Sequence, residues 1–353
     1  VHEGEVFARG AADNKGQCFY TITALKALLE TLKTLPINLK FIIEGEEESG
    51  SVNLFKLLQK KREALKADYL LIIDSGIEEV DTPAITLGAR GIVCAEISLQ
   101  EAQFDLHSGM AGGLAYNPNR ALVELLSKLH DEKGSVTIPG FYDEVKALSP
   151  KEKSALSFDF HVTRFQEMFG FIPTGMEAGV APYESSWLRP TLEINGMWGG
   201  YTGPGFKTVI PAKASAKISC RLVPNQSPKR ILKLVTNFLK AHSPPSMQLH
   251  IEPFPGNGRG FRTNSNSRIA KIMAQSYADV FQKPCKKILI GGSIPVAVDL
   301  CEAAQAEMIL VGVGLPDDRI HSPNEHFGLK RFELGYLTIC RAITLFKEEK
   351  NEA

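Results

Sequence analysis

The stretch LKFIIEGEEESGSVNLFKLLQKKREALKADYLLIID, residues 39–74, carries the pattern that indicates the fold. Two apolar runs of strand length, residues 39–43 and 69–73, flank a segment whose apolar residues recur at helical spacing between Val52 and Leu58. The same helical period runs through residues 22–32, just before the first apolar run. Strands that alternate with helices are typical of a mostly parallel sheet covered by helices, so the sequence predicts an α/β domain.

The pattern changes from residue 91 onward to longer alternating strands, of which residues 92–97 are the clearest. The glycine- and proline-rich stretch 253–260 reads as a hinge, after which helix and strand signals resume. We therefore expect one α/β domain that contains an inserted α+β domain. The predicted division is 1–90 with 261–353 for the first and 91–260 for the second, with helices near 121–129 and 231–239 and an unassigned path over 138–201.

The overall charge and the cysteines restrict the classes of partner and compartment. Forty basic residues balance forty acidic residues at a pI of about 7.2, so no net charge favours binding to nucleic acid or to an anionic membrane. No apolar run approaches the roughly 20 residues needed to span a bilayer. Six cysteines without paired spacing are typical of free thiols in a reducing compartment, which predicts a cytoplasmic protein. Because the chain opens on Val1 without a leader pattern, we expect its natural start to lie upstream.

Acidic residues follow the two apolar runs of the opening stretch. Glu46-Glu47-Glu48 comes after the first run and Asp74 directly after the second, where ligands gather in open α/β sheets. Asp13 precedes the first helix, and His321 follows a predicted strand over 308–313. As separate features these residues fit a helix cap, a solvated acidic loop, a turn and a surface histidine. Taken together, carboxylates and a histidine at the ends of one sheet predict a paired Zn²⁺ site.

Seven motifs stand out along the chain: residues 8–16 (ARGAADNKG), 44–51 (EGEEESGS), 105–109 (DLHSG) with Gly112-Gly113, 207–211 (KTVIP), 221–225 (RLVPN), 291–295 (GGSIP) and 321–325 (HSPNE). Together and in this order, they resemble the motifs of the aminoacylase/carnosinase metallopeptidase family, and the nearest branch resembles the carnosinase-type dipeptidases. The resemblance covers essentially the whole chain.

The resemblance implies a dinuclear metal centre with Zn²⁺, or alternatively Mn²⁺. Asp13 matches the carboxylate that bridges both metals, Glu48 and His321 match ligands of one metal, and Asp74 matches a ligand of the other. Glu47 matches the general base that deprotonates the attacking water and protonates the leaving amine. The resemblance also implies a cis peptide bond after Asp13.

Further residues acquire roles by the same resemblance. His107 matches a histidine that reaches the active site of the partner subunit and stabilises the oxyanion, which implies a homodimer formed through the inserted lid domain. Arg221 matches the residue that binds the free C-terminal carboxylate of a small peptide substrate. Thr208, Ser293 and Asn119 match positions near the bound dipeptide, where ordinary turn or cap roles are equally compatible with the sequence.

The chain departs from the family pattern at one important motif. It contains no His-x-Asp pair, whose histidine binds the second metal in the family, so we expect that pair to precede Val1 and the second site to be incomplete in this chain. Residues 264–267 also lack a histidine that related dipeptidases carry for the substrate. Dipeptide hydrolysis is the predicted function. The alternatives are an N-acyl amino acid deacylase and a catalytically impaired dimeric homologue, whereas nucleotide binding is disfavoured because GNGRG at 256–260 does not fit GxGxxG.

Overall fold

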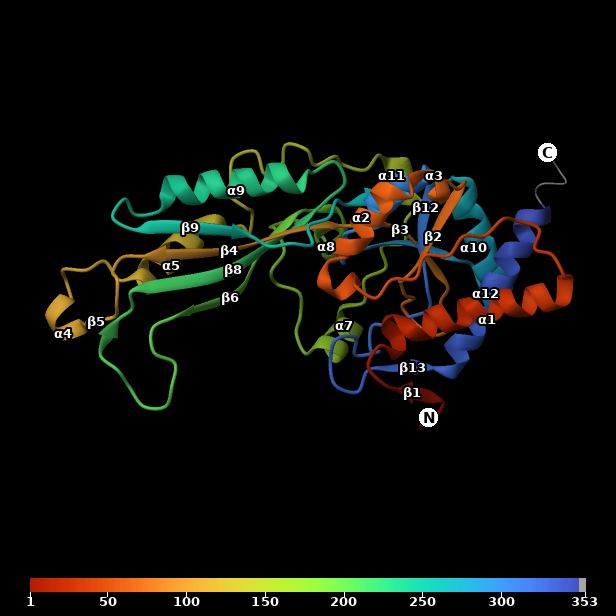
Figure 1. Ribbon diagram of the computed structural model, residues 1–353, viewed down its shortest axis with the longest axis horizontal. Coiled ribbons are helices and arrows are strands. Elements are labelled where there is room, and N and C mark those ends of the chain that lie inside the picture. The colour runs from red at the N-terminus through yellow and green to blue at the C-terminus, as the bar shows by residue number, and fades with distance from the viewer. Residues whose placement is uncertain (349–353) are drawn as a thin grey trace.

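The computed structural model describes residues 1–348, and Figure 1 shows two parts joined by several crossing segments. The first part contains a five-stranded sheet. Four of its strands follow the order β10-β3-β12-β2, and the fifth, β11, also pairs with β3. The pairs β11·β3 and β12·β2 are parallel, whereas β10·β3 and β12·β3 are antiparallel, so the sheet is mixed. The strands are β2 (Tyr69–Ile73), β3 (Ala84–Ala89), β10 (Phe261–Arg262), β11 (Lys286–Ile290) and β12 (Glu307–Val311).

Helices cover both faces of this sheet because its central strands alternate their apolar side chains between two cores. Along β12, Ile309 and Val311 belong to one core, whereas Met308 and Leu310 belong to the other. Three long helices pack against one another beside the first core, and three shorter ones surround the second. The first set is α1 (Gly16–Leu32), α10 (Arg268–Phe281) and α12 (Leu329–Glu348), and the second is α2 (Val52–Lys60), α3 (Arg62–Leu65) and α11 (Ala297–Ala304).

The second part is a four-stranded antiparallel sheet in the order β6-β8-β4-β9. Alternate residues of β4 are buried, and α5 and α9 pack over the sheet to complete a separate core. A two-stranded ribbon, β5·β7, and the short helix α4 lie at the far end of this part from α1 (Figure 1). The bounds are β4 (Gly91–Gln100), β5 (Leu106–His107), α4 (Ser108–Ala111), α5 (Pro118–Leu126) with η3 (Ser127–Leu129), β6 (Thr191–Gly199), β7 (Val209–Ile210), β8 (Lys213–Leu222), α9 (Pro228–His242) and β9 (Gln248–Pro253).

The segment that sequence analysis left unassigned returns to the first part of the molecule. It forms α6 (Pro150–Ser154), α7 (Val162–Phe169) and α8 (Pro182–Leu188) before entering β6. Leu148, Trp187 and Leu188 are buried in the core that contains α1 and α12, and Ser157 donates its backbone N–H to the carbonyl of Lys287. Part of the predicted inserted domain therefore packs with the residues that flank it.

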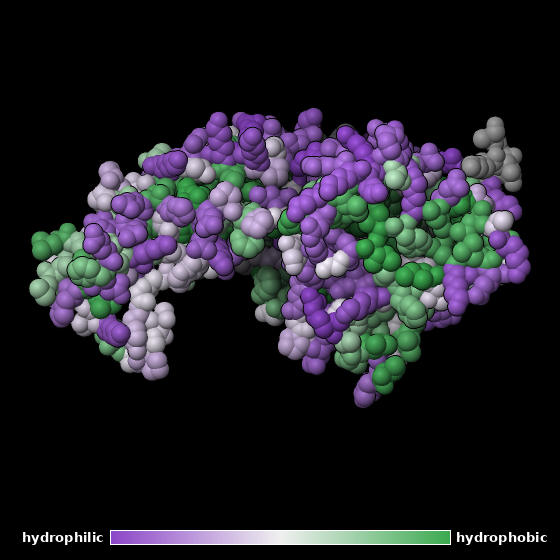
Figure 2. Space-filling model, viewed as in Figure 1, coloured by the Kyte–Doolittle hydropathy of each residue, from purple (hydrophilic) through white to green (hydrophobic). Residues whose placement is uncertain are grey.

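The predicted elements of the opening stretch are formed with one exception. The helix over 22–32 is within α1, the helix from Val52 is α2, and the strand over 69–73 is β2. The strand predicted over 39–43 is wrong, because this segment pairs with no strand among residues 1–348, and Phe41 and Ile43 are 52% and 65% exposed. Apolar side chains are visible on this face of the molecule (Figure 2). The prediction of an α/β protein with a further α+β part is confirmed.

One small strand pair joins the start of the described chain to the segment just before α12. β1 (Glu5–Phe7) pairs antiparallel with β13 (His326–Gly328), so residues 8–15 and 315–325 lie next to each other. Gly16 allows this approach, because a Cβ there would lie 2.7 Å from the ring of Phe327. Within residues 1–348 no helix is long and apolar enough to cross a membrane.

Candidate active site

Asp13 lies in a loop that begins after β1 and ends at the first turn of α1. A short helical turn, η1 (Ala11–Lys15), contains Asp13 and Asn14 with non-helical dihedral angles, and the peptide bond between them is cis as predicted. Asn14 donates from Nδ2 to the carbonyl of Ile73 at 2.6 Å, which ties the loop to the end of β2 just before Asp74.

The carboxylates of residues 44–48, which follow the segment 39–43, fall into two groups. Glu44 accepts a hydrogen bond from Ser51 Oγ at 2.9 Å, and Glu46 accepts from the backbone and side chain of Asn53. Both are thereby engaged in the turn that leads into α2. Glu47 and Glu48 begin a 3₁₀ turn, η2 (Glu47–Ser49), and are the members of the run that lie near Asp13 and His321.

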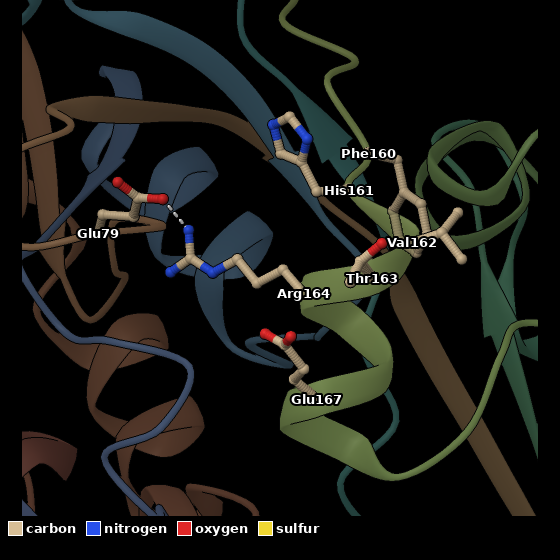
Figure 3. Close-up of a pocket in the computed structure, with 7 residues that line it drawn as sticks. All are labelled: Glu79, Phe160, His161, Val162, Thr163, Arg164 and Glu167. Atoms are coloured by element: carbon tan, nitrogen blue, oxygen red, sulfur yellow. Dashed lines mark hydrogen bonds and ion pairs between the residues drawn. The ribbon is translucent and has the colours of Figure 1, made fainter.

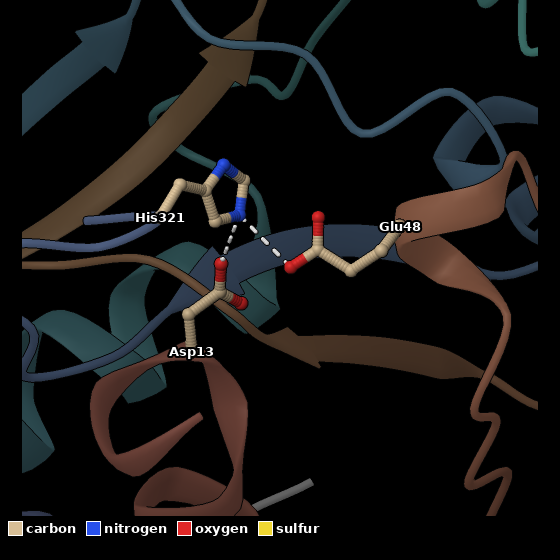
Figure 4. Close-up of side chains that lie close together, drawn as sticks. All are labelled: Asp13, Glu48 and His321. Atoms are coloured by element: carbon tan, nitrogen blue, oxygen red, sulfur yellow. Dashed lines mark hydrogen bonds and ion pairs between the residues drawn. The ribbon is translucent and has the colours of Figure 1, made fainter. Parts of the chain in front are cut away.

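Three of the predicted metal ligands come together in space. His321 Nε2 lies 3.0 Å from Asp13 Oδ2 and 2.8 Å from Glu48 Oε1, and the three side chains converge from different loops (Figure 4). One donor atom from each of these residues lies within 4.8 Å of the others. An imidazole and two carboxylates at this separation form a donor set suited to a divalent cation such as Zn²⁺.

Two more carboxylates lie close enough to this cluster for its negative charges to raise their pKa values. Burial, together with the charges of Asp13, Glu47 and Glu48, raises the pKa of Asp74 to about 7. Burial and the same kind of repulsion, led by Glu48, also raise the pKa of Glu47, and burial and Glu48 raise that of Asp13. A group of carboxylates that resists ionisation needs protons or cations for compensation, so the donor set and its surroundings fit a metal.

Sequence analysis missed two residues that support this cluster. Glu325, only 3% exposed, accepts hydrogen bonds from the backbone N–H groups of Gly10, Ala12 and Asp13. Burial acts to raise the pKa of Glu325, but these N–H groups and Arg9 hold it below its ordinary value. Arg9 bridges Glu325 and Glu48. Both residues stand inside the motifs 8–16 and 321–325, so motif membership was the signal that could have drawn attention to them.

A second predicted group lies where the two parts of the molecule meet. Arg221, near the end of β8, donates from Nη1 to Ser293 Oγ at 2.9 Å. Arg90, between β3 and β4, donates to the carbonyl of Gly291 in the same GGSIP motif. Burial lowers the pKa of both arginines, and the charge of Arg221 contributes to bringing that of Arg90 to about 10. Two partly desolvated guanidinium groups in one region favour a bound carboxylate.

The remaining predicted residues lie on the part of the molecule that carries the four-stranded sheet. His107 pairs with Val209 across β5·β7, and Ser108 N–H donates to the carbonyl of Thr208, so His107 and Thr208 are neighbours. His107 is exposed and caps α4, its Nδ1 accepting from the N–H of Gly109 at 3.0 Å. Asn119, at the start of α5, donates to the carbonyl of Gly199 and lines a cavity of about 200 Å³ with Lys207.

A larger pocket of about 530 Å³ is lined by none of the predicted site residues (Figure 3). His161 and Arg164 line it from the start of α7, and Arg164 forms an ion pair with Glu79 from the loop after β2. This ion pair anchors α7 to the first part of the molecule.

Comparison with known proteins finds a matching family and several relatives. The sequence model of "Peptidase family M20/M25/M40" matches residues 1–345. The chain is 32% identical over 337 residues to the human Beta-Ala-His dipeptidase, with 92% of this chain and 65% of that protein covered. It is 31% identical over 351 residues to the Cys-Gly metallodipeptidase dug1 of Schizosaccharomyces pombe, with 96% of this chain and 72% of that protein covered.

A solved structure shows the same relationship in three dimensions. The di-peptidase Dug1p from Saccharomyces cerevisiae superposes with a TM-score of 0.86 at 27% identity, covering 98% of this chain and 73% of that one. The chain spans about two thirds of the length of the Beta-Ala-His dipeptidases that it matches. The match of the family over nearly all of the chain, and the fold it shares with a solved member, lead to one conclusion: the chain belongs to peptidase family M20/M25/M40.

Proposed function

We propose that this protein catalyses the metal-dependent hydrolysis of dipeptides, at the amide bond next to a free C-terminal carboxylate. The observation that carries the proposal is the convergence of Asp13, Glu48 and His321 beside Glu47 and Asp74, two carboxylates whose pKa values are raised. The human and yeast relatives are dipeptidases by name, which supports the same class of substrate for this chain.

Family membership implies a divalent metal cofactor, and we propose two ions per subunit, Zn²⁺ or alternatively Mn²⁺. Asp13, Glu48 and His321 would hold one ion, and Asp13 and Asp74 would contribute to the second site. The chain has no His-x-Asp pair, so it would supply fewer ligands to the second ion than to the first. A divalent ion bound here lowers the pKa of water and polarises the peptide carbonyl.

Glu47 is the proposed general base. Its pKa is raised by burial and by the charge of Glu48, and a carboxylate with a raised pKa is a stronger base, which takes up a proton from water more readily. Glu47 would thus take a proton from the attacking water and later deliver it to the amine nitrogen. Glu46 is unsuited to this role, because its carboxylate is bonded to Asn53.

The free carboxylate of the substrate is assigned to Arg221, with Ser293 beside it. The hydrogen bond between these two side chains supports the assignment, since it holds the guanidinium in one orientation. We propose that Thr208 and Asn119 contact the bound dipeptide and that His107 stabilises the developing oxyanion. Figure 1 shows β5, which carries His107, at the opposite end of the molecule from α1, which supports a role for His107 in the partner subunit of a homodimer.

This arrangement requires the part of residues 91–260 that carries the four-stranded sheet to serve as a lid and dimerisation domain inserted between 1–90 and 261–353, whereas residues 148–188 pack with the first part. The protein would work in the cytoplasm, with small peptides as its substrates and neither nucleic acid nor a membrane as its partner. All six cysteines are free, which fits a reducing compartment.

Hydrolysis of a panel of dipeptides and N-acetyl amino acids, with added Zn²⁺ or Mn²⁺, tests the proposal. Dipeptide cleavage that disappears in Glu47→Ala would support it. Preferential cleavage of N-acetyl amino acids would favour a deacylase instead. A dimeric protein that binds metal but cleaves neither class would indicate a catalytically impaired homologue.

A further inference from the structure

Glu325 connects the loops that carry the candidate metal ligands. Its Oε1 accepts from the backbone N–H groups of Ala12 at 3.1 Å and Asp13 at 3.0 Å, and its Oε2 accepts from that of Gly10 at 2.7 Å. These three N–H groups belong to the loop that ends at Asp13. A single carboxylate therefore fixes the backbone of the residue proposed to bridge two ions.

The same carboxylate is linked to the other two ligands. Arg9 Nη1 donates to Glu325 Oε2 at 3.1 Å, and Arg9 Nη2 donates to Glu48 Oε1 at 2.9 Å. His321 lies four residues before Glu325 in the same loop, and the backbone carbonyl of Glu325 accepts from Ala8 N–H. Asp13 is thus connected to Glu325 through its backbone N–H, Glu48 is connected through Arg9, and His321 is connected through the loop that it shares with Glu325.

The burial of Glu325 makes these contacts specific. Its side chain is 1% exposed, whereas those of Glu48 and His321 are 47% and 56% exposed. A buried carboxylate with four donors cannot exchange them for water, so its hydrogen bonds restrict where the loop can move. Glu48 and His321 are thus open to solvent, whereas the carboxylate that connects them to Asp13 is buried.

We propose that Glu325 is a positioning residue that preorganises Asp13, Glu48 and His321 for a divalent metal, with Arg9 as the link to Glu48. This inference rests on the proposed function, because it takes the cluster to be a metal site. Residues that hold metal ligands in place typically change metal affinity by about 10- to 100-fold when they are replaced.

The test is the Zn²⁺ affinity of the full chain and its variants, measured by competition with a chromophoric chelator. Glu325→Gln keeps the size of the side chain but replaces an acceptor oxygen with a donor amide, so we expect an affinity at least about 10-fold lower. Arg9→Gln removes the link to Glu48 at a side chain that is 59% exposed, so it should fold normally and lower the affinity by a smaller factor.

Glu177→Gln is the matched control. Glu177 accepts two N–H groups from Arg189 in residues 91–260, and its side chain is 13% exposed. This variant should lower the melting temperature of the metal-free protein without changing Zn²⁺ affinity, which is also the result that a merely structural Glu325 would give.

Two results would contradict the proposal, and they are distinguishable. If wild-type protein binds Zn²⁺ and cleaves dipeptides while Glu325→Gln and Arg9→Gln bind Zn²⁺ as tightly, the positioning role is wrong and the proposed function stands. If wild-type protein neither binds Zn²⁺ nor cleaves dipeptides, the proposed function is wrong, and the role of Glu325 falls with it.

Discussion

Asp13, Glu48 and His321 come from three loops far apart in the sequence, whereas His107 lies on the short strand β5 and Thr208 directly precedes β7, with which β5 pairs. The first group is joined by side-chain contacts and rests on the buried Glu325. The second group is exposed on a two-stranded ribbon, where His107 accepts from Gly109 N–H and the carbonyl of Thr208 accepts from Ser108 N–H. Carboxylates that repel one another need a fixed support. His107, which we propose to act in the partner subunit, needs only to be exposed.

This difference predicts different consequences of substitution. Changes in the acidic cluster should alter metal binding, the chemical step and the pH dependence of stability. Changes on the ribbon should leave metal content and folding intact and affect only turnover. Each of the following experiments tests one side of this distinction.

The largest effect is expected for Glu47→Gln. An isosteric amide cannot accept the proton of water, so kcat should fall by about 10³-fold while metal content stays unchanged. Kinetics with a good dipeptide substrate, together with metal analysis of the same preparations, measures both quantities.

Glu46→Gln is the matched control for Glu47→Gln. Glu46 is the preceding residue, but its carboxylate is engaged by Asn53, so its variant should keep most of the activity. Equal losses in the two variants would mean that the acidic run acts through its total charge and contains no single base.

His107→Ala should lower kcat by about 10²-fold, because it removes one donor to the oxyanion. Metal content and melting temperature should not change, since the ring is exposed and its hydrogen bond is to the neighbouring Gly109 N–H. If His107 acts in the partner subunit, mixing His107→Ala with Glu47→Gln should restore about a quarter of wild-type activity through mixed dimers. Activity that does not recover on mixing, after subunit exchange is confirmed, would restrict His107 to its own subunit.

Arg221→Lys tests whether Arg221, where the two parts of the molecule meet, binds the free carboxylate of the substrate. A lysine cannot form the paired hydrogen bonds of a guanidinium, so KM for dipeptides should rise by roughly 10- to 100-fold with a smaller change in kcat. Dipeptide amides, which lack the free carboxylate, should be cleaved equally slowly by both proteins. Arg230→Lys, at a surface arginine paired with Asp143 and Glu144, should behave as wild type.

The sequence was sufficient for most of the fold because the deciding signals were local. The helical period of 22–32 and the apolar run of β2 correspond to the observed α1 and β2. The run over 39–43 has the same composition but forms no strand, because a strand needs a neighbour to satisfy its backbone and the structure has none for it in residues 1–348. Apolar composition cannot reveal whether such a neighbour is present.

The candidate site divides in the same way. The family motifs predicted which residues would meet, and Asp13, Glu48 and His321 do meet. The roles of these and the other predicted residues stay predictions until the variants are measured. Membership of the motif 321–325 could have marked Glu325, but its proposed positioning role was not predictable from sequence, because that role depends on which backbone N–H groups a distant loop presents to it. Burial and hydrogen bonding of this kind appear only in three dimensions.

The smallest effect we expect is on stability, at Asp74. In metal-free protein the pKa of Asp74 is raised to about 7, so the folded state binds its proton more tightly than the unfolded state does. The contribution of Asp74 to the free energy of unfolding should therefore be fully present in acid and should be lost as pH rises from about 4 through 7. Asp74→Asn has no proton to lose, so its stability should decline less. Above pH 7 in the presence of a chelator, it should exceed wild type by at least about 1.4 kcal/mol.

Added Zn²⁺ should reverse that order, because an ionised Asp74 is then a ligand and its amide is a poor one. Urea unfolding curves at pH 5 and pH 8, with chelator and with Zn²⁺, measure all four combinations. Parallel pH dependence in the two chelated proteins would show that neither burial nor the charges of Asp13, Glu47 and Glu48 raise the pKa of Asp74. The acidic cluster would then consist of Asp13, Glu48 and His321, and only the support that Glu325 provides would distinguish it from the ribbon.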